Sequence, residues 1–205
     1  MQFALNSIAS LNLSGLNIFL VASSLIIALC TTLILLSVLI SFLLFDKAQA
    51  PVVKKSKVDT FTMLLFFVAF YFVVRFRVGQ INLPTALQLG LLGVGLIVIV
   101  LGTIVNIVGR FNLSTNWANH IKIYSSHTFV QSGMYRLVRH PLYASLIWMF
   151  FAASLVYANW LGALLTAAIF VPMMYYRARQ EEELLQRRFK QYAAYKQKVK
   201  MFVPW

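Results

Sequence analysis

Acidic side chains are scarce in this sequence, and so is charge of any kind. Only five of the 205 residues are Asp or Glu, and Asp, Glu, Lys and Arg together make up 11%. A soluble domain usually carries about twice that charged fraction. Hydrophobic residues make up 60% of the chain, and they gather in long runs without charge. This composition argues against a soluble protein and predicts an integral membrane protein.

Cysteine and histidine are nearly absent as well. The one cysteine, Cys30, lies inside an apolar run, so no disulfide can form within the chain, and we expect a small apolar filler there. His120, His127 and His140 are too widely spaced for a compact helical set of metal ligands, and we expect no metal site. Residues 1–17 contain no Lys or Arg, so the basic start of a secretory signal peptide is missing.

Long apolar runs make up much of the sequence. A helix needs about 20 apolar residues to cross the hydrocarbon core of a bilayer. Five runs approach or exceed that length and predict an all-α protein with about five transmembrane helices: 16–45, 60–74, 84–108, 141–157 and 160–176. Only Ala158 and Asn159 separate the last two, which predicts a tight antiparallel hairpin, and Pro172 is expected to kink the end of the fifth helix. The third run holds four glycines that favour close helix packing: Gly90, Gly93, Gly95 and Gly102.

The basic residues indicate the orientation. Of the 18 Lys and Arg residues, four follow the first run, four the third and eight the fifth, which places 16 on one side and only Arg75 and Arg77 on the other. The positive-inside rule then predicts an outside N-terminus and a cytoplasmic C-terminus. Basic flanks of this kind favour an anionic membrane surface as partner, and no nucleic acid. We expect one membrane domain over 1–205, with three helices in 1–108 and a loop, the hairpin and a tail helix in 109–205.

Two polar stretches would face the cytoplasm. The loop 109–140 is long but rich in aromatic residues, so we expect it to fold onto another part of the chain. The stretch from Arg177 to Glu183 holds three of the five acidic residues. It fits either a solvated helix with an Arg177–Glu181 pair one turn apart or a functional site at the membrane boundary. The triplet from Arg139 to Pro141, taken alone, fits the start of a helix.

The tail predicts an amphipathic helix. Its apolar residues recur at steps of three and four: Leu185, Phe189, Tyr192, Tyr195, Val199 and Phe202. Such a helix fits the headgroup region of the membrane, which we favour on this pattern alone. The alternative is that it packs over a cytoplasmic pocket.

Two motifs in order resemble those of a known family. Residues 127–143, HTFVQSGMYRLVRHPLY, resemble the signature H-x-L-V-x-x-G-x-Y-R-x-x-R-H-P-x-Y of the isoprenylcysteine carboxyl methyltransferase family and its phospholipid methyltransferase relatives. After a hydrophobic hairpin, residues 177–185 match R-x-x-x-E-E-x-x-L, and the tail also follows the family pattern. The resemblance covers about residues 109–205. Three departures are Phe129 for the usual Leu, Ser145 for the usual Gly, and a Phe189–Tyr192 spacing that is one residue short and lacks a Gly.

The resemblance implies a membrane-embedded enzyme that uses S-adenosylmethionine in a cytoplasmic pocket roofed by the loop and the tail. It implies catalytic roles for Arg177, which would hold a carboxylate acceptor, and for Glu182, which with His140 is a candidate base for an amine acceptor. The residues implied to bind the cofactor are His127, Phe129, Val130, Gly133, Tyr135, His140, Pro141, Tyr143 and Glu181. The acceptor is expected to be amphiphilic or lipid-like, entering among membrane lipids.

Two alternatives remain open at this point. One is a non-enzymatic membrane protein that keeps the fold without the chemistry. The other is a membrane reductase of the sterol type with a nicotinamide cofactor, although such enzymes are generally longer. The sequence decides neither between a carboxylate and an amine acceptor nor the oligomeric state.

Overall fold

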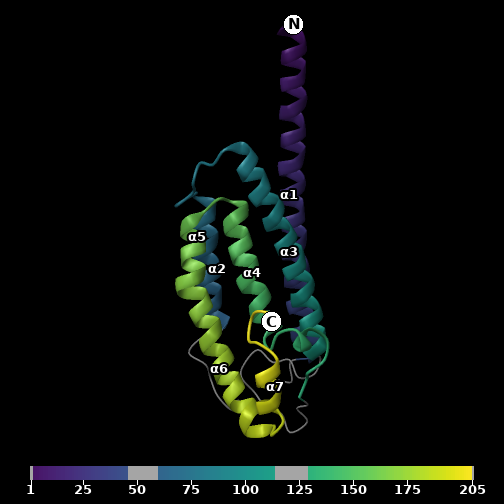
Figure 1. The fold of residues 1–205 in the computed structure, drawn as a ribbon, viewed down its shortest axis with the longest axis vertical. Helices are drawn as coiled ribbons and strands as arrows, with labels where there is room; N and C mark the ends of the chain where they lie inside the picture. The colour runs from purple at the N-terminus through teal and green to yellow at the C-terminus, as the bar shows by residue number, and fades with distance from the viewer. Residues whose placement is uncertain (1, 46–59, 114–128, 205) are drawn as a thin grey trace.

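The computed structural model describes residues 2–45, 60–113 and 129–204 (Figure 1). Every regular element in these three stretches is helical, apart from one isolated bridge between Gln80 and Asn159. The prediction of an all-helical fold is therefore confirmed for the described residues. The elements are α1 (Gln2–Phe45), α2 (Thr60–Arg75), α3 (Thr85–Leu113), η2 (Gly133–Arg136), α4 (Pro141–Val156), α5 (Trp160–Leu165), η3 (Thr166–Phe170), α6 (Val171–Arg188) and α7 (Tyr192–Lys198).

Within the described stretches, three helices are long and apolar enough to cross a membrane: Ile18–Leu44 of α1, Thr85–Leu113, and the continuous helix Trp160–Arg188. The protein is thus an integral membrane protein by composition and helix length. The other two predicted spans also form apolar helices, α2 and α4, each of 16 residues. At 1.5 Å per residue they extend about 24 Å, which is less than the roughly 30 Å of the hydrocarbon core. The count of five membrane crossings stays a prediction.

Glycine brings α3 against α4 at two positions. A Cβ atom added to Gly95 would lie 2.5 Å from Val156 Cγ2, and one added to Gly102 would lie 2.6 Å from Met149 Cγ. Any larger side chain would push the helices apart. Gly90 and Gly93 have nothing within 4 Å of such a Cβ, so the predicted close packing holds for two of the four glycines. Cys30 of α1 is buried in an apolar cluster with residues of α3 and α4, which confirms its expected role as filler.

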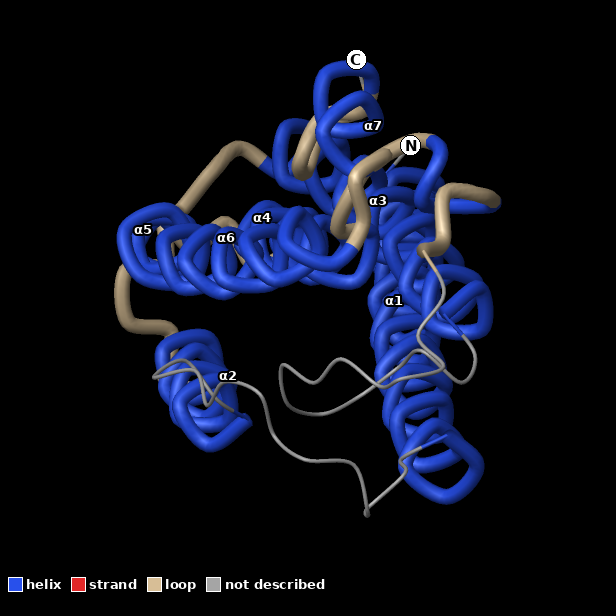
Figure 2. Tube along the Cα trace, turned by 90° about the horizontal axis from the view of Figure 1, so that it is seen from below, coloured by secondary structure: helices blue, strands red, loops and turns tan. Residues whose placement is uncertain are grey.

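The turn between α4 and α5 is tight, as predicted, and it is fastened to the connection between α2 and α3. The Asn159 side chain accepts a hydrogen bond from Gly162 N at 2.7 Å and donates one to Val78 O at 2.9 Å. The Trp160 amide donates to Gly79 O at 3.0 Å. Figure 2 shows the result: α4, α5 and α6 form a row that meets α3 at one end, with α1 along α3 and α2 on one side of the row.

The helix of the fifth predicted span is longer than expected and contains a π-helical turn. The helix does not end near Tyr176 but continues to Arg188, and a π-helical turn, Thr166–Phe170, comes directly before Val171 and Pro172. Proline has no amide hydrogen and its ring clashes with the carbonyl one turn earlier, so a wider turn accommodates it. The continuous helix carries Glu181 to Glu183 past the apolar core, to the end of the bundle where α4 begins.

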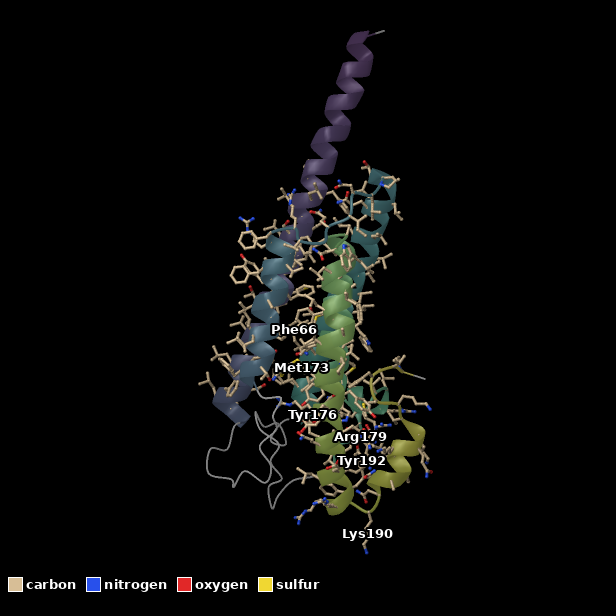
Figure 3. The ribbon with its side chains drawn as sticks, turned by 90° about the vertical axis from the view of Figure 1, so that its left-hand side faces the viewer. Phe66, Met173, Tyr176, Arg179, Lys190 and Tyr192 are labelled. Carbon is tan, nitrogen blue, oxygen red and sulfur yellow. The ribbon has the colours of Figure 1, made fainter. Side chains whose placement is uncertain are left out.

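An aromatic cluster holds α2, α4 and α6 together. Phe66 of α2 stacks on Phe170 with ring centroids 4.7 Å apart, and Phe150 of α4 meets Phe170 edge-on at the same distance. Met174 of α6 is fully buried in the same cluster. The apolar side chains around Phe66 and Met173 contrast with the charged ones around Arg179 and Lys190 at the far end of α6 (Figure 3).

The tail is not one amphipathic helix, and this prediction is wrong. α6 ends at Arg188, the chain turns at Phe189, and the short helix α7 folds back. Tyr192 and Tyr195 are buried against the segment that leads into α4 rather than facing a lipid surface. Polar and aromatic groups of the segment before α4 are the partners of the tail, so the tail packs over one end of the bundle, as in the alternative prediction.

Candidate functional site

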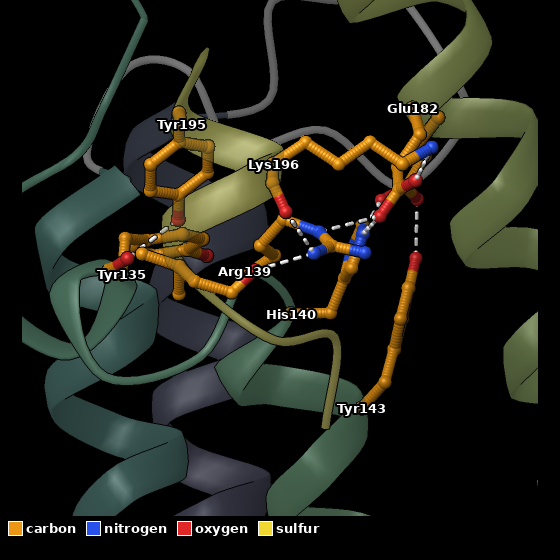
Figure 4. A network of polar contacts seen from close by, with 9 residues as sticks. Tyr135, Arg139, His140, Tyr143, Glu182, Tyr195 and Lys196 are labelled. Atoms are coloured by element: carbon orange, nitrogen blue, oxygen red, sulfur yellow. Dashed lines mark hydrogen bonds and ion pairs between the residues drawn. The ribbon is translucent and has the colours of Figure 1, made fainter. Parts of the chain in front are cut away.

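The start of α4 and the end of α6 meet in a buried polar network (Figure 4). His140 is the residue before the first turn of α4, and Pro141 opens that turn, where its missing amide hydrogen costs nothing. Arg139 Nε donates to Glu182 Oε1 at 2.8 Å. The predicted convergence of the two motifs therefore exists in the structure.

Glu182 is the most buried charge of this network. Its side chain is 1% exposed, yet it lies near three cationic or basic groups. Besides Arg139, His140 Nε2 lies 3.4 Å from Oε1, and Lys196 Nζ of α7 lies 2.8 Å from Oε2. The Lys196 contact is an ion pair by distance, without the geometry of a linear hydrogen bond. A buried carboxylate is tolerated only when it is paired in this way.

Glu181, one residue earlier, points to a second set of partners and is more accessible, with 27% of its side chain exposed. Tyr143 donates its hydroxyl hydrogen to Glu181 Oε1, and the same hydroxyl accepts a hydrogen bond from Arg177 Nε at 2.8 Å. Arg177 Nε is also 3.7 Å from Glu181 Oε1, so the sequence-predicted one-turn pair forms. Arg177 reaches α2 as well, where Nη1 lies 3.6 Å from Met63 Sδ.

His140 lies between the two carboxylates. Its Nδ1 is 3.5 Å from Glu181 Oε2, and its Nε2 faces Glu182. Burial alone would lower the pKa of His140, but the hydrogen bonds to Glu181 and Glu182 outweigh burial and raise this pKa. A neutral imidazole has one N–H and cannot donate to both carboxylates. The ring also stacks on Tyr143, with centroids 5.6 Å apart and planes inclined by 10°.

The segment before Arg139 is shaped by Gly133 and Asn112. Gly133 has φ +61°, a conformation that favours glycine, and a Cβ atom there would lie 2.1 Å from Asn112 Oδ1. The same oxygen accepts a hydrogen bond from Met134 N at 3.0 Å. The close approach that Gly133 permits is thus filled by Asn112 of α3. Tyr135 follows in η2, is buried, and its carbonyl accepts a hydrogen bond from the Tyr195 hydroxyl.

The tail closes over this segment through its backbone. Arg139 N donates to Lys200 O at 2.9 Å, and His140 N donates to Met201 O at 3.2 Å. The Arg139 guanidinium adds hydrogen bonds to Lys196 O, at 3.1 Å, and to Val199 O. The two motifs and the tail therefore form one packed unit, although the tail lies about 60 residues from the first motif in sequence.

Two of the three departures from the family pattern have a structural counterpart. The Phe129 ring packs on Phe189, Tyr192 and Tyr195, with centroids 5.6, 5.4 and 5.2 Å apart, so the larger side chain fills the space under the shortened tail. The Ser145 hydroxyl accepts a hydrogen bond from Asn106 Nδ2 at 2.9 Å and joins α4 to α3, which glycine does not do.

The sequence-predicted site residues divide into three groups. His140, Tyr143, Arg177, Glu181 and Glu182 share one network of polar contacts. Phe129, Gly133, Tyr135 and Pro141 border it through the segment before α4, and Val130 lies there half-buried. His127 lies outside the described residues.

Sequence reasoning missed three members of this region. Arg139 was read only as a helix boundary, although its place in the first motif marked it for more. Lys196 and Asn112 belong to no pattern that points to them, because their roles depend on how the tail and α3 approach the motif. A fourth residue, Gln180, is 7% exposed, and its Oε1 atom is buried without a hydrogen-bond partner in the described part of the chain.

The fold and this site define an integral membrane protein of packed apolar helices with a charged, aromatic-lined site at one end of the bundle. Residues 94–187 match the model of the isoprenylcysteine carboxyl methyltransferase (ICMT) family. The resemblance is therefore confirmed over this segment, which carries both motifs and makes up less than half of the chain. The match begins inside α3, earlier than the predicted start of the resemblance, and ends before the tail.

One curated relative is Methanethiol S-methyltransferase 1 of Bradyrhizobium diazoefficiens. It is 38% identical over 74 residues, which is 35% of this chain and 25% of the relative. The alignment thus spans about a quarter of the relative's length.

Proposed function

We propose that this protein is a membrane-embedded, S-adenosylmethionine-dependent methyltransferase that acts on an amphiphilic or lipid-like acceptor. The observation that carries the proposal is the meeting of the first motif with the acidic pair of the second in one buried network, where Arg139 Nε lies 2.8 Å from Glu182 Oε1. The family match and the name of the relative support a methyltransferase. The donor and the acceptor are inferences from the family and from the chemistry of the site.

The residues of the network suit a donor that carries a positive sulfonium and an amino-acid end. Glu181 offers a carboxylate that is part exposed, and the Tyr143 ring, whose hydroxyl donates to that carboxylate, offers aromatic surface beside it. Aromatic faces and carboxylates both attract cations. The bound donor supplies a methyl group on sulfur that is open to displacement. We assign its binding to Phe129, Val130, Gly133, Tyr135, His140, Pro141, Tyr143 and Glu181, with His127 a further candidate.

The acceptor is proposed to meet Arg177. This guanidinium is held by the Tyr143 hydroxyl and by Glu181, and it extends toward Met63 of α2. An arginine fixed in this way suits the alignment of a carboxylate, because its fork of N–H groups matches two carboxylate oxygens. Alignment of that kind is a main source of rate enhancement in a displacement reaction.

The two candidate bases argue for an acceptor that arrives already ionised. Glu182 lies near Arg139, His140 and Lys196, and His140 is stabilised in its protonated form by two carboxylates. Both ring nitrogens of His140 face carboxylates, and Glu182 is enclosed by its three partners, so neither group is placed to take a proton from an amine. A carboxylate needs no base, so we favour it over an amine. Glu182 then acts by fixing Arg139 and His140 in place rather than by taking a proton.

A thiol acceptor is a second candidate, because the aligned relative is named for methanethiol. A thiol with an ordinary pKa of about 8.5 needs only modest help from a nearby cation to react as a thiolate. Arg177 is such a cation. A small thiol also needs no lipid-sized path through the helices.

Gln180 supports a polar ligand beside Arg177. It lies three residues after Arg177 on the same helix, so the two side chains are neighbours on the helix surface. A buried carbonyl oxygen without a partner costs about 1–3 kcal/mol. We propose that an N–H or O–H group of the bound acceptor donates to Gln180 Oε1.

The orientation follows from the charge distribution. We propose an outside N-terminus, with the site and the C-terminus in the cytoplasm, because most basic residues lie on the side of the site. The aromatic residues Tyr157 and Trp160 at the opposite turn are exposed and suit the other interface.

The test uses the purified full chain in lipid nanodiscs with a methyl-labelled donor and three acceptor pools: a membrane lipid extract, an isoprenylated cysteine analogue, and a small thiol. Label in the first or second pool supports the proposed acceptor class, and label confined to the thiol supports the second candidate. No transfer together with no binding of S-adenosylhomocysteine contradicts the proposal and favours a non-enzymatic protein. Binding of a nicotinamide cofactor would favour the reductase alternative.

A further inference from the structure

The short helix α7 carries a lysine that reaches back to the buried network. Lys196 Nζ lies 2.8 Å from Glu182 Oε2, and the two side chains are 28% and 1% exposed. Lys196 lies beyond residue 187, where the family match ends. It belongs to neither of the two motifs.

The carboxylate that Lys196 contacts already connects two distant segments. Through its other oxygen, Glu182 is bound to Arg139 at 2.8 Å and lies 3.4 Å from His140. One carboxylate of α6 is therefore shared by the segment before α4 and by the tail. Because a buried charge is costly without partners, each of these contacts fixes where the others lie.

Lys196 is connected to the same unit a second time through its backbone. Its carbonyl accepts a hydrogen bond from Arg139 Nη1 at 3.1 Å. The side chain of Lys196 thus holds Glu182, while its main chain holds Arg139, and these two residues hold each other (Figure 4). A closed triangle of contacts restricts all three members more than any single pair does.

We infer that Lys196 is a positioning residue for the proposed methyl transfer. Through Glu182 it keeps the tail seated on the segment from Arg139 to His140, and so keeps His140 beside Glu181. This inference rests on the proposed function, because the groups it positions are those assigned to donor binding. The contacts that carry the inference are those of Lys196 with Glu182 and Arg139.

Loss of the Lys196 charge leaves a folded protein with a loosened site. Arg139 still neutralises Glu182, and the backbone hydrogen bonds from Arg139 and His140 to Lys200 and Met201 remain. Only the Oε2 side of the carboxylate loses its ion pair. The expected change is weaker donor binding, with a smaller change in the rate at saturating donor.

The experiment compares three variants of the full chain in nanodiscs. Lys196→Met removes the charge and keeps the length of the side chain, and Lys196→Arg restores the charge. Lys198→Met is the matched control, because Lys198 lies on the same helix and is exposed. We expect Lys196→Met to weaken S-adenosylhomocysteine binding and to raise the donor KM by about tenfold, Lys196→Arg to recover to within about threefold, and Lys198→Met to stay within about twofold.

Kinetics and a double variant separate this inference from simple loss of stability and from failure of the proposed function. Adding Lys196→Met to Glu182→Gln should weaken donor binding by much less than tenfold, because the partner is already gone. Equal effects of Lys196→Met and Lys198→Met, or an unchanged donor KM with a lower yield of folded protein, overturn the positioning role. If the unaltered protein itself neither binds the donor nor transfers methyl groups, the proposed function fails, and this inference fails with it.

Discussion

Arg139 and Glu182 are 43 residues apart in the chain, yet Arg139 Nε donates a hydrogen bond to Glu182 Oε1 at 2.8 Å. The helical hairpin between them accounts for this contact. α4 leads away from the site, the turn at Asn159 reverses the chain, and the continuous helix from Trp160 to Arg188 returns past the starting level. Both motifs of the resemblance therefore end at the same place, because the returning helix is longer than α4.

Arg139 is expected to carry a large part of the local stability. Arg139→Met removes the hydrogen bond to Glu182 and those to Lys196 O and Val199 O, and it leaves a buried carboxylate with fewer partners. Breaking a buried pair in this way costs about 3–5 kcal/mol. Unfolding in detergent, followed by tryptophan fluorescence, measures the effect. Arg136→Met is the control, since Arg136 is exposed, and its change should stay within about 0.5 kcal/mol. Equal effects of the two substitutions would refute a structural role for the pair.

Tyr143 is expected to act on the acceptor through Arg177. Tyr143→Phe removes the hydroxyl that accepts from Arg177 Nε and donates to Glu181, and it keeps the ring that stacks on His140. We predict a fall of about 10- to 100-fold in kcat/KM for the acceptor, which corresponds to about 1.4–2.8 kcal/mol. Donor affinity should change less. Tyr175→Phe serves as the control because Tyr175 is exposed. If Tyr143→Phe has the acceptor kinetics of the parent protein, Tyr143 does not position Arg177.

For Gln180 we predict that one substitution keeps or raises the stability of the protein and weakens its use of the acceptor. Gln180→Leu replaces a buried oxygen that has no hydrogen-bond partner among the described residues by an apolar group, so the stability should stay equal or rise. If the acceptor donates to that oxygen, its KM should rise by about tenfold. Gln186→Leu on the exposed side of α6 is the control. A Gln180→Leu variant with the acceptor KM of the parent protein shows that this oxygen binds no ligand.

The stability of the protein is expected to depend on pH through His140. The contacts with Glu181 and Glu182 raise the pKa of His140 above its ordinary value of 6.5, despite burial, so the protonated form stabilises the folded state. That contribution is complete below about pH 6.5 and is lost as the pH rises through the raised folded-state value. Of the groups around the ring, Glu181 and Glu182 raise this pKa, whereas Tyr143 and Phe202 contact the ring with their aromatic faces or edges. Arg139 and Lys196 contact Glu182.

The measurement is the thermal midpoint of the parent protein and of His140→Gln at about pH 6 and about pH 9. The difference between the two proteins should be larger at the lower pH. A difference that is constant with pH, or larger at the higher value, contradicts a protonated His140 between the two carboxylates.

Much of the bundle follows from the sequence, because long apolar runs bounded by charge allow few alternatives to membrane helices. The hairpin turn at Ala158 and Asn159 was predictable from its length alone. The π-helical turn before Pro172 was not, since it depends on how α6 accommodates a proline while Phe170 stays in the aromatic cluster. The break between α6 and α7 was not predictable either. The apolar side chains of the tail repeat every 3.6 residues whether they face lipid or protein.

The site, like the fold, was predictable from the sequence only in part. Its main residues were predictable because the motifs name them, and the helical hairpin makes their meeting necessary. The partners that complete the network, Lys196 and Asn112, come from segments whose approach is set by tertiary packing. The role of Glu182 needed the structure as well, because only its burial and its near contacts with Arg139, His140 and Lys196 favour fixing these neighbours over proton transfer.

Calorimetric titration of the purified protein with S-adenosylhomocysteine tests the central claim most directly. We predict saturable binding at one site per chain and an affinity at least about tenfold lower in His140→Gln. Absence of binding to a folded parent protein, or equal affinity in His140→Gln, would contradict a donor site at the meeting point of the two motifs.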